Sequence, residues 1–160
     1  MTLPEQHVYN PFFRPTELPA MKFAFFRRKK SDKETSWEVV GCIAIDPVPV
    51  YDDDDDLDIS YVREMDTCGT YVFDNLKHFP SKAQLANAVL FAQQQLLHEV
   101  ARGNYHVLLL EGWQLTLFRR GKRHRIKVEY TGRPAHLSGK IPPLRPPPFM
   151  AVLKGQHLFS

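Results

Sequence analysis

The densest group of side chains that could bind a charged ligand lies at positions 119–127. Six cations there surround a single glycine: Arg119, Arg120, Lys122, Arg123, Arg125 and Lys127. Guanidinium and ammonium groups bind phosphate oxygens and carboxylates, so the cluster could hold nucleic acid or an acidic protein. A strand edge that only resists aggregation needs one or two lysines rather than six cations. The cluster therefore favours a binding role over simple solvation.

Two segments with β-strand periodicity flank these cations. Apolar residues occupy alternate positions on both sides: Trp113, Leu115, Leu117, Ile126, Val128 and Tyr130. This alternation predicts a hairpin whose apolar residues face the core and whose cations face outward. A basic ribbon of this kind can follow a phosphate backbone, with an affinity that depends on salt.

A second basic group, at 27–30, lies nearer the N-terminus. Arg27 and Arg28 would extend the first cluster if the two hairpin tips lie close together. If the tips lie apart, a charged tip is simply solvated. The sequence leaves both interpretations open.

An acidic run contrasts with these cations. It consists of Asp52, Asp53, Asp54, Asp55 and Asp56. Consecutive aspartates cannot all face one ion, and the spacing of an EF-hand loop is absent. We expect a solvated, disordered loop within 46–58. The alternative is an acidic strip that covers the protein's own basic hairpin or enters a basic groove of a partner.

Motifs of the common enzyme classes are absent from the sequence. There is no Walker A loop, no G-x-S-x-G and no G-x-G-x-x-G. His98 begins a sequence like H-E-x-x-H, but Arg102 replaces the second histidine. The carboxylates of Asp46, Glu64 and Asp66, together with a lysine, could form the site of a metal-dependent nuclease, although any chain offers such a set. We therefore expect a non-enzymatic protein with no cofactor and no metal.

The two cysteines, Cys42 and Cys68, are not part of a CxxC pair. We expect them to be reduced core residues rather than nucleophiles. The N-terminus lacks the pattern of a signal peptide, and no apolar run approaches the ~20 residues that span a bilayer. These features predict a cytoplasmic protein without a membrane partner.

A long helix is predicted at 82–102. Ser81 and Gln84 fit a capping box, and Gly103 suits the left-handed position after the helix. Apolar residues follow at helical spacing: Leu85, Val89, Ala92, Leu96 and Val100. We expect this face to pack on a sheet.

Strands are predicted on both sides of the helix. Segment 21–28 should pair with 36–45, which places Trp37, Val39, Ile43 and Ile45 on one face and ends at Asp46-Pro47. Short strands follow at 59–63 and 70–73, with their pairing left open. A central strand at 105–110, broken by Gly112, precedes the hairpin. The predicted class is α+β: a mainly antiparallel sheet with one long helix on one face.

Thirteen prolines cluster near the two ends of the chain. They predict a single domain at 21–132 between an extended N-terminal arm, 1–20, and a proline-rich C-terminal arm, 133–160. The apolar end of the second arm should dock on the core or on a second subunit, which would give a homodimer. Residues 140–146 also match the loose pattern of polyproline ligands, although a rigid arm is the simpler interpretation.

These features lead to one main functional hypothesis and two others. The main one is a non-enzymatic protein whose basic hairpin engages nucleic acid or a complex that handles nucleic acid. The first alternative is an inhibitor or adaptor of the kind that phages and mobile elements carry, with charged loops and arms that clamp a partner protein. A metal-dependent enzyme is the least favoured.

Overall fold

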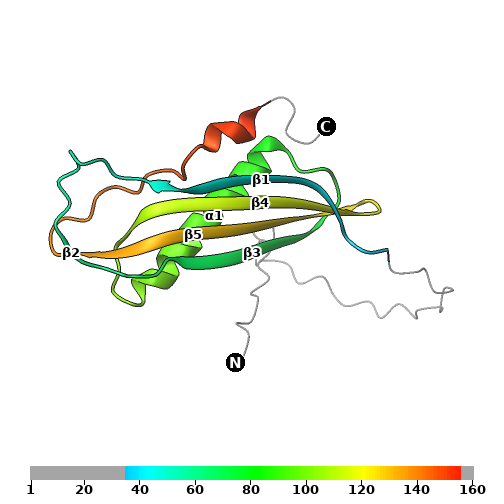
Figure 1. The fold of residues 1–160 in the computed structure, drawn as a ribbon. Helices are drawn as coiled ribbons and strands as arrows, with labels where there is room; N and C mark the ends of the chain where they lie inside the picture. The colour runs from blue at the N-terminus through cyan, green and yellow to red at the C-terminus, as the bar shows by residue number, and fades with distance from the viewer. Residues whose placement is uncertain (1–34, 156–160) are drawn as a thin grey trace, which may run out of the picture.

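The computed structural model describes residues 35–155 of the 160-residue chain. In chain order its elements are β1 (Glu38–Pro49), β2 (Ile59–Val62), β3 (Thr67–Leu76), α1 (Lys82–Ala101), β4 (Val107–Arg120), β5 (Arg123–Leu137) and the 3-10 helix η1 (Met150–Lys154). One helix packs on a mainly antiparallel sheet, so the predicted α+β class is confirmed (Figure 1). The predicted arm at 1–20 and strand at 21–28 lie outside the described residues.

The sheet is organised around β5. On one side β5 pairs with β4, which in turn pairs with β1. On the other side β3 pairs with positions 124–132 of β5, and β2 pairs with positions 135–137. All four pairings are antiparallel. The two short predicted strands therefore both pair with β5 and occupy different parts of its length.

The helix α1 begins as predicted. Ser81 accepts a hydrogen bond from the backbone N–H of Gln84, and the Gln84 side chain accepts one from the backbone N–H of Ser81. This is the expected capping box. After the helix, Asn104 takes the left-handed φ of 64°, so the prediction for Gly103 is wrong. A last turn of backbone hydrogen bonds carries the helical path through Gly103, and asparagine tolerates the left-handed position that follows.

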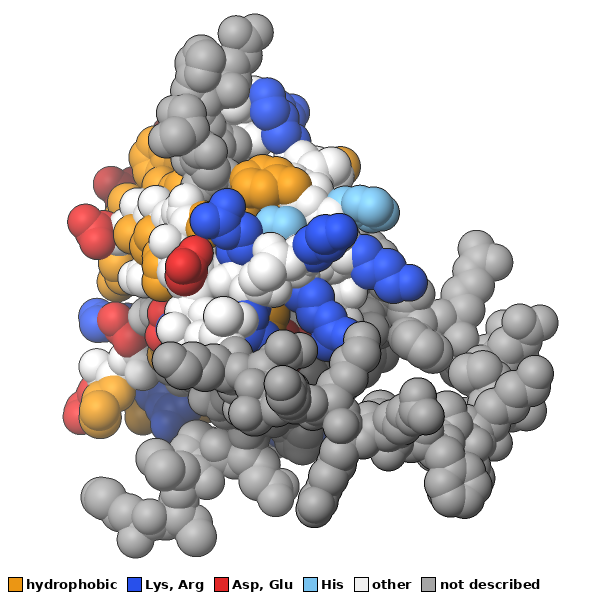
Figure 2. Space-filling view, turned by 90° about the vertical axis from the view of Figure 1, so that its right-hand side faces the viewer, with side chains coloured by type: hydrophobic (Ala, Val, Ile, Leu, Met, Phe, Trp, Pro, Cys, Tyr) orange, Lys and Arg blue, Asp and Glu red, His pale blue; other side chains and the backbone are white. Residues whose placement is uncertain are grey.

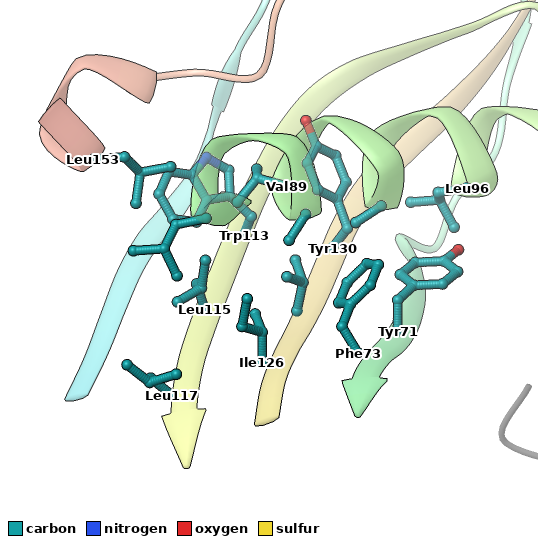
Figure 3. Close-up of a cluster of buried hydrophobic side chains, with 14 of the residues drawn as sticks. Tyr71, Phe73, Val89, Leu96, Trp113, Leu115, Leu117, Ile126, Tyr130 and Leu153 are labelled. Carbon is teal, nitrogen blue, oxygen red and sulfur yellow. The ribbon is translucent and has the colours of Figure 1, made fainter. Parts of the chain in front are cut away.

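The core lies between α1 and one face of the sheet (Figure 3). The predicted apolar face of the helix is buried: Leu85, Val89, Ala92, Leu96 and Val100. The predicted inward residues of the hairpin are also buried: Trp113, Leu115, Leu117, Ile126, Val128 and Tyr130. Tyr71 and Phe73 of β3 complete this layer. Outward residues of the same strands therefore lie on a second face of the sheet, here called the open face because no described helix covers it.

An irregularity in β1 changes which of its residues share a face. The pairing with β4 shifts between Val39 and Gly41. An extra residue in one strand moves the preceding side chains to the opposite face. Ile43 and Ile45 pack against the core as expected, whereas Val39 is 61% exposed. The prediction that Trp37 and Val39 share a face with Ile43 and Ile45 is therefore wrong.

The backbones of β1 and β4 approach closely where the sequence predicted that a strand would end in each of them. β1 continues past Asp46-Pro47 to Pro49, and β4 runs without a break through Gly112. A Cβ atom on Gly112 would lie 2.8 Å from the carbonyl oxygen of Ile45 and 2.7 Å from the nitrogen of Pro47. Glycine at this position therefore permits the contact between β1 and β4 and does not end a strand.

The C-terminal part of the described chain docks on the domain. β5 extends to Leu137, so the predicted domain boundary between residues 132 and 133 falls inside a strand. An extended segment follows, and η1 then places Leu153, which is fully buried, in the main core. Residues 150–153 of the arm therefore pack on their own domain, and docking of the arm on a second subunit stays a prediction.

Candidate functional site

The turn between β4 and β5 places the basic cluster at one end of the sheet. Arg120 and Arg123 form the last pair of the ladder, which leaves a two-residue turn of Gly121 and Lys122. Gly121 has φ of 61°, a backbone conformation that the tight turns of hairpins require and that glycine adopts at low cost. The predicted hairpin is therefore confirmed, and its tip carries cations on both strands.

The pleat of β5 gives the two faces of the hairpin different characters. Ile126 and Val128 are buried, while Arg125 and Lys127 point to the open face. There Arg125 lies opposite Phe118, and Lys127 lies opposite Thr116. The open face near the tip therefore combines cations with an aromatic ring.

Half of the six cations have carboxylate partners. Arg119 pairs with Glu38, and Lys127 pairs with Glu129 of its own strand, each at 3.2 Å. Arg125 binds Asp74 of β3 through two nitrogens. Arg125 is consequently part of the sheet's own ion pairing and is less available than the sequence alone suggests.

The other three cations have no acidic partner among the described residues. They are Arg120, Lys122 and Arg123, and all three lie at the hairpin tip. Lys122 and Arg123 are exposed, and Arg120 is half-buried. The positive charge of the tip is therefore not neutralised by the part of the chain that the structure describes.

A tryptophan adjoins the free cations. The ring of Trp37, immediately before β1, lies 4.6 Å from the guanidinium carbon of Arg120 and 4.3 Å from that of Arg125, measured to the ring centroid. Both distances fall within the range of cation–π contacts. The sequence does not predict this contact, because strict alternation puts Trp37 on the same face as Ile43 and Ile45. Gly41 is the available signal, since a glycine inside a strand pattern often marks a bulge.

The end of β3 adds further basic groups beside the tip. Leu76 pairs with His124 of β5, and the exposed Lys77 follows it directly. Burial, together with the neighbouring charges of Arg119 and His78, lowers the pKa of His124. Figure 2 looks onto this end of the molecule, and Lys, Arg and His side chains gather on it.

The acidic loop lies at the opposite end of the sheet (Figure 1). Asp52 and Asp55 close a turn, because the Asp52 N–H donates to the Asp55 carboxylate and the Asp55 N–H donates to the Asp52 carbonyl. Asp55 also forms an ion pair with Arg145. The loop thus has local structure where we predicted disorder, and Asp55 is bound to the C-terminal segment and not to the basic hairpin.

Several other predicted residues can now be placed. Cys42 and Cys68 are free and exposed, so the expectation that they are core residues is wrong. Each lies at a position next to an inward residue, which puts it on the open face.

Asp66 forms an ion pair with Arg133. Within 35–155, no group of three or more His, Cys, Asp or Glu residues could hold a metal ion. Arg27 and Arg28 lie outside the described residues.

Comparisons with models of protein families, with curated proteins and with solved structures give no match. Among the described residues, no helix has the length and apolar character needed to cross a membrane.

Proposed function

We propose that the protein is a non-enzymatic binding protein that engages nucleic acid with its basic hairpin tip. The observation that carries this proposal is the group of three cations without acidic partners, Arg120, Lys122 and Arg123, next to the ring of Trp37. Cations without partners can neutralise phosphates, and each phosphate contact releases counterions and makes the affinity depend on salt.

The aromatic ring suggests how a nucleic acid could lie on this surface. Unpaired bases stack on aromatic rings and on guanidinium planes, and such stacking tolerates any sequence. Trp37, Arg120 and Arg125 offer both kinds of surface side by side. We therefore expect single strands to bind more tightly than duplexes of the same length.

The test removes the free cations and compares the result with an equal loss of charge elsewhere. The test variant carries Arg120→Gln, Lys122→Gln and Arg123→Gln. The control carries Arg63→Gln, Arg102→Gln and Lys140→Gln, which change three exposed cations outside the hairpin. Both variants reduce the formal net charge from +3 to zero. Binding to a labelled oligothymidine and to a duplex is measured by fluorescence anisotropy at several salt concentrations.

We expect the test variant to lose at least about tenfold in affinity and to lower the salt slope by about two units for single strands. The control should lose much less and keep most of the slope. Equal losses in both variants would show that only net charge matters. No binding by the unchanged protein at low salt would contradict the proposal.

An acidic partner protein is the second candidate. It is favoured by the carboxylates of Glu38, Asp74 and Glu129, which already occupy the hairpin's other cations. The same surface could bind carboxylates of a partner protein, for which this protein would act as an inhibitor or an adaptor. Polyglutamate in place of the oligonucleotide distinguishes the two, because carboxylates cannot replace bases that stack on Trp37. Polyglutamate binding that matches or exceeds oligothymidine binding would favour the acidic protein.

A further inference from the structure

A cavity of about 430 Å³ lies at the opposite side of the molecule from the hairpin tip, between the C-terminal half of α1, the start of β4 and the segment after β5. Its size is typical of sites for small organic ligands. Apolar side chains form much of its wall: Leu97, Val107, Leu108, Ile141 and Leu144. Tyr51 and Tyr105 add aromatic surface.

One ionisable side chain in the wall lacks a charged partner. Glu111 is 2% exposed, and its Oε1 accepts hydrogen bonds from the Gln93 amide at 3.0 Å and from the Tyr130 hydroxyl at 3.2 Å. Oε2 receives only a longer contact of 3.4 Å from the same amide. No described cation lies within ion-pair distance of this carboxyl. A buried carboxylate is normally paired with a cation or neutralised by a proton, so the ionised form of Glu111 favours a positive charge beside it.

The arginine in the cavity wall already has other partners. Arg145 lines the cavity, but its Nη1 donates to the carbonyl oxygen of Val50 at 2.8 Å and its Nη2 pairs with Asp55. Its guanidinium also lies 4.9 Å from the ring centroid of Tyr51. Because Asp55 offsets the charge of Arg145, the ionised Glu111 gives the cavity a net negative charge.

We propose that this cavity binds a small organic cation, an amine carried on an apolar or aromatic body, whose nitrogen pairs with the Glu111 carboxylate. The apolar wall takes the body of the ligand, and Oε2 has acceptor capacity left for its N–H groups. The site is independent of the proposed nucleic-acid surface, since the two share no residue.

Ionisation of Glu111 sets the pH at which such a ligand binds. Burial raises the pKa of Glu111 to about 7, while the hydrogen bonds from Gln93 and Tyr130 act in the opposite direction. Burial, followed by the nearby Glu111, raises the pKa of Tyr51 and of Tyr130, so both phenols stay neutral at this pH. The other titratable or charged groups around the cavity are His98, Tyr105, His106 and Arg145 with its partner Asp55.

The experiment uses three probes that share one aromatic body: phenethylamine, the neutral 2-phenylethanol and the anion phenylacetate. Binding to the full chain is measured by calorimetry at about pH 8, where Glu111 is largely ionised. We expect phenethylamine to bind at least about tenfold more tightly than either of the other probes, as a charge-assisted hydrogen bond implies. At about pH 7, in buffers of different ionisation enthalpy, its binding should release on the order of half a proton.

Two variants and one control complete the test. Glu111→Gln should lower phenethylamine affinity about tenfold or more and abolish the proton release. Leu144→Trp, at a residue that is 55% exposed and therefore tolerant of change, should also weaken binding by narrowing the cavity. The control Glu129→Gln, on the open face, should bind like the unchanged protein. Absence of saturable phenethylamine binding, equal binding of 2-phenylethanol, or tighter binding of phenylacetate would each overturn the proposal.

Discussion

The indole N–H of Trp113 donates a hydrogen bond of 2.9 Å to the carbonyl oxygen of Pro148. This bond joins the middle of β4 to the segment that follows β5, 35 residues further along the chain. Proline-rich segments offer carbonyl acceptors but few N–H donors, so a side-chain donor from the sheet is an effective way to hold one in place.

Trp113→Phe should therefore lower the free energy of unfolding by about 1–3 kcal/mol, because the Pro148 carbonyl loses its donor and part of a buried ring is removed. Urea unfolding followed by circular dichroism measures the change. Trp37→Phe is the control, because that ring lies over arginine side chains and is not part of the main core, and we expect it to cost less than about 0.5 kcal/mol. Equal costs for the two variants would mean that the bond to Pro148 contributes little.

The second prediction concerns the buried face of α1. Leu96 is fully buried between the helix and the sheet, so Leu96→Ala should cost about 2–5 kcal/mol of unfolding free energy. Leu144, which is 55% exposed, provides a comparison of the same type, and Leu144→Ala should cost less than about 1 kcal/mol. A loss below about 1 kcal/mol at Leu96 would contradict the packing of the helix on the sheet.

Much of this fold follows from local patterns in the sequence. The capping residues Ser81 and Gln84 and the period of Leu85, Val89 and Leu96 identify the helix, because these signals depend only on neighbours in the chain. The alternation around Ile126 likewise identifies the hairpin and its inward face. These features need no knowledge of which strand pairs with which.

The errors come from contacts between distant segments. The bulge before Gly41 turns Trp37 to the open face, and the pairing of β1 with β4 turns Gly112 from a predicted break into a close contact. Asp74 neutralises Arg125 only because β3 pairs with β5. The inward position of Glu111 could have been predicted from the sequence, because it lies two residues before the inward Trp113 and side chains two apart in a strand share a face.

The third prediction concerns the aspartate loop. Asp55 bonds to Arg145 and to the Asp52 N–H, whereas Asp54 is exposed and has no partner among the described residues. Asp55→Asn should therefore lower the unfolding free energy by about 1 kcal/mol, and Asp54→Asn by less than about 0.5 kcal/mol. Thermal unfolding of the two variants in parallel gives the comparison. Identical melting temperatures would show that the loop is merely solvated.

The fourth prediction separates the charge of this loop from its structure. Replacement of Asp52, Asp53, Asp54 and Asp56 by asparagine keeps Asp55 and raises the formal net charge from +3 to +7. Fold stability should change little, and affinity for oligothymidine should rise slightly because long-range attraction grows. Anisotropy titrations at low and high salt would measure this rise, which should vanish at high salt. A fall in affinity would mean that the aspartates take part in binding.

The last prediction concerns Glu111 and the dependence of stability on pH. Its carboxyl has a pKa of about 7 in the folded protein, against 4.5 for an unperturbed glutamate. Below pH 4.5 the Glu111 carboxyl is protonated in both the folded and the unfolded protein, so it does not lower the free energy of unfolding. As pH rises from 4.5 to 7, only the unfolded state loses the proton freely, so folding stability falls by up to about 3 kcal/mol and stays lower above pH 7.

Glu111→Gln removes this contribution because the amide oxygen can still accept from Gln93 and Tyr130 without carrying a charge. The variant should match the unchanged protein near pH 4.5 and exceed its unfolding free energy by up to about 3 kcal/mol at pH 8. Urea unfolding at both pH values measures the difference, and other carboxylates cancel because they are common to both proteins. Glu129→Gln, at a half-buried carboxylate on the open face, should show no such gain at pH 8. If Glu111→Gln instead proves less stable than the unchanged protein at pH 8, the buried carboxylate is favourable as a charge and our account of its environment is wrong.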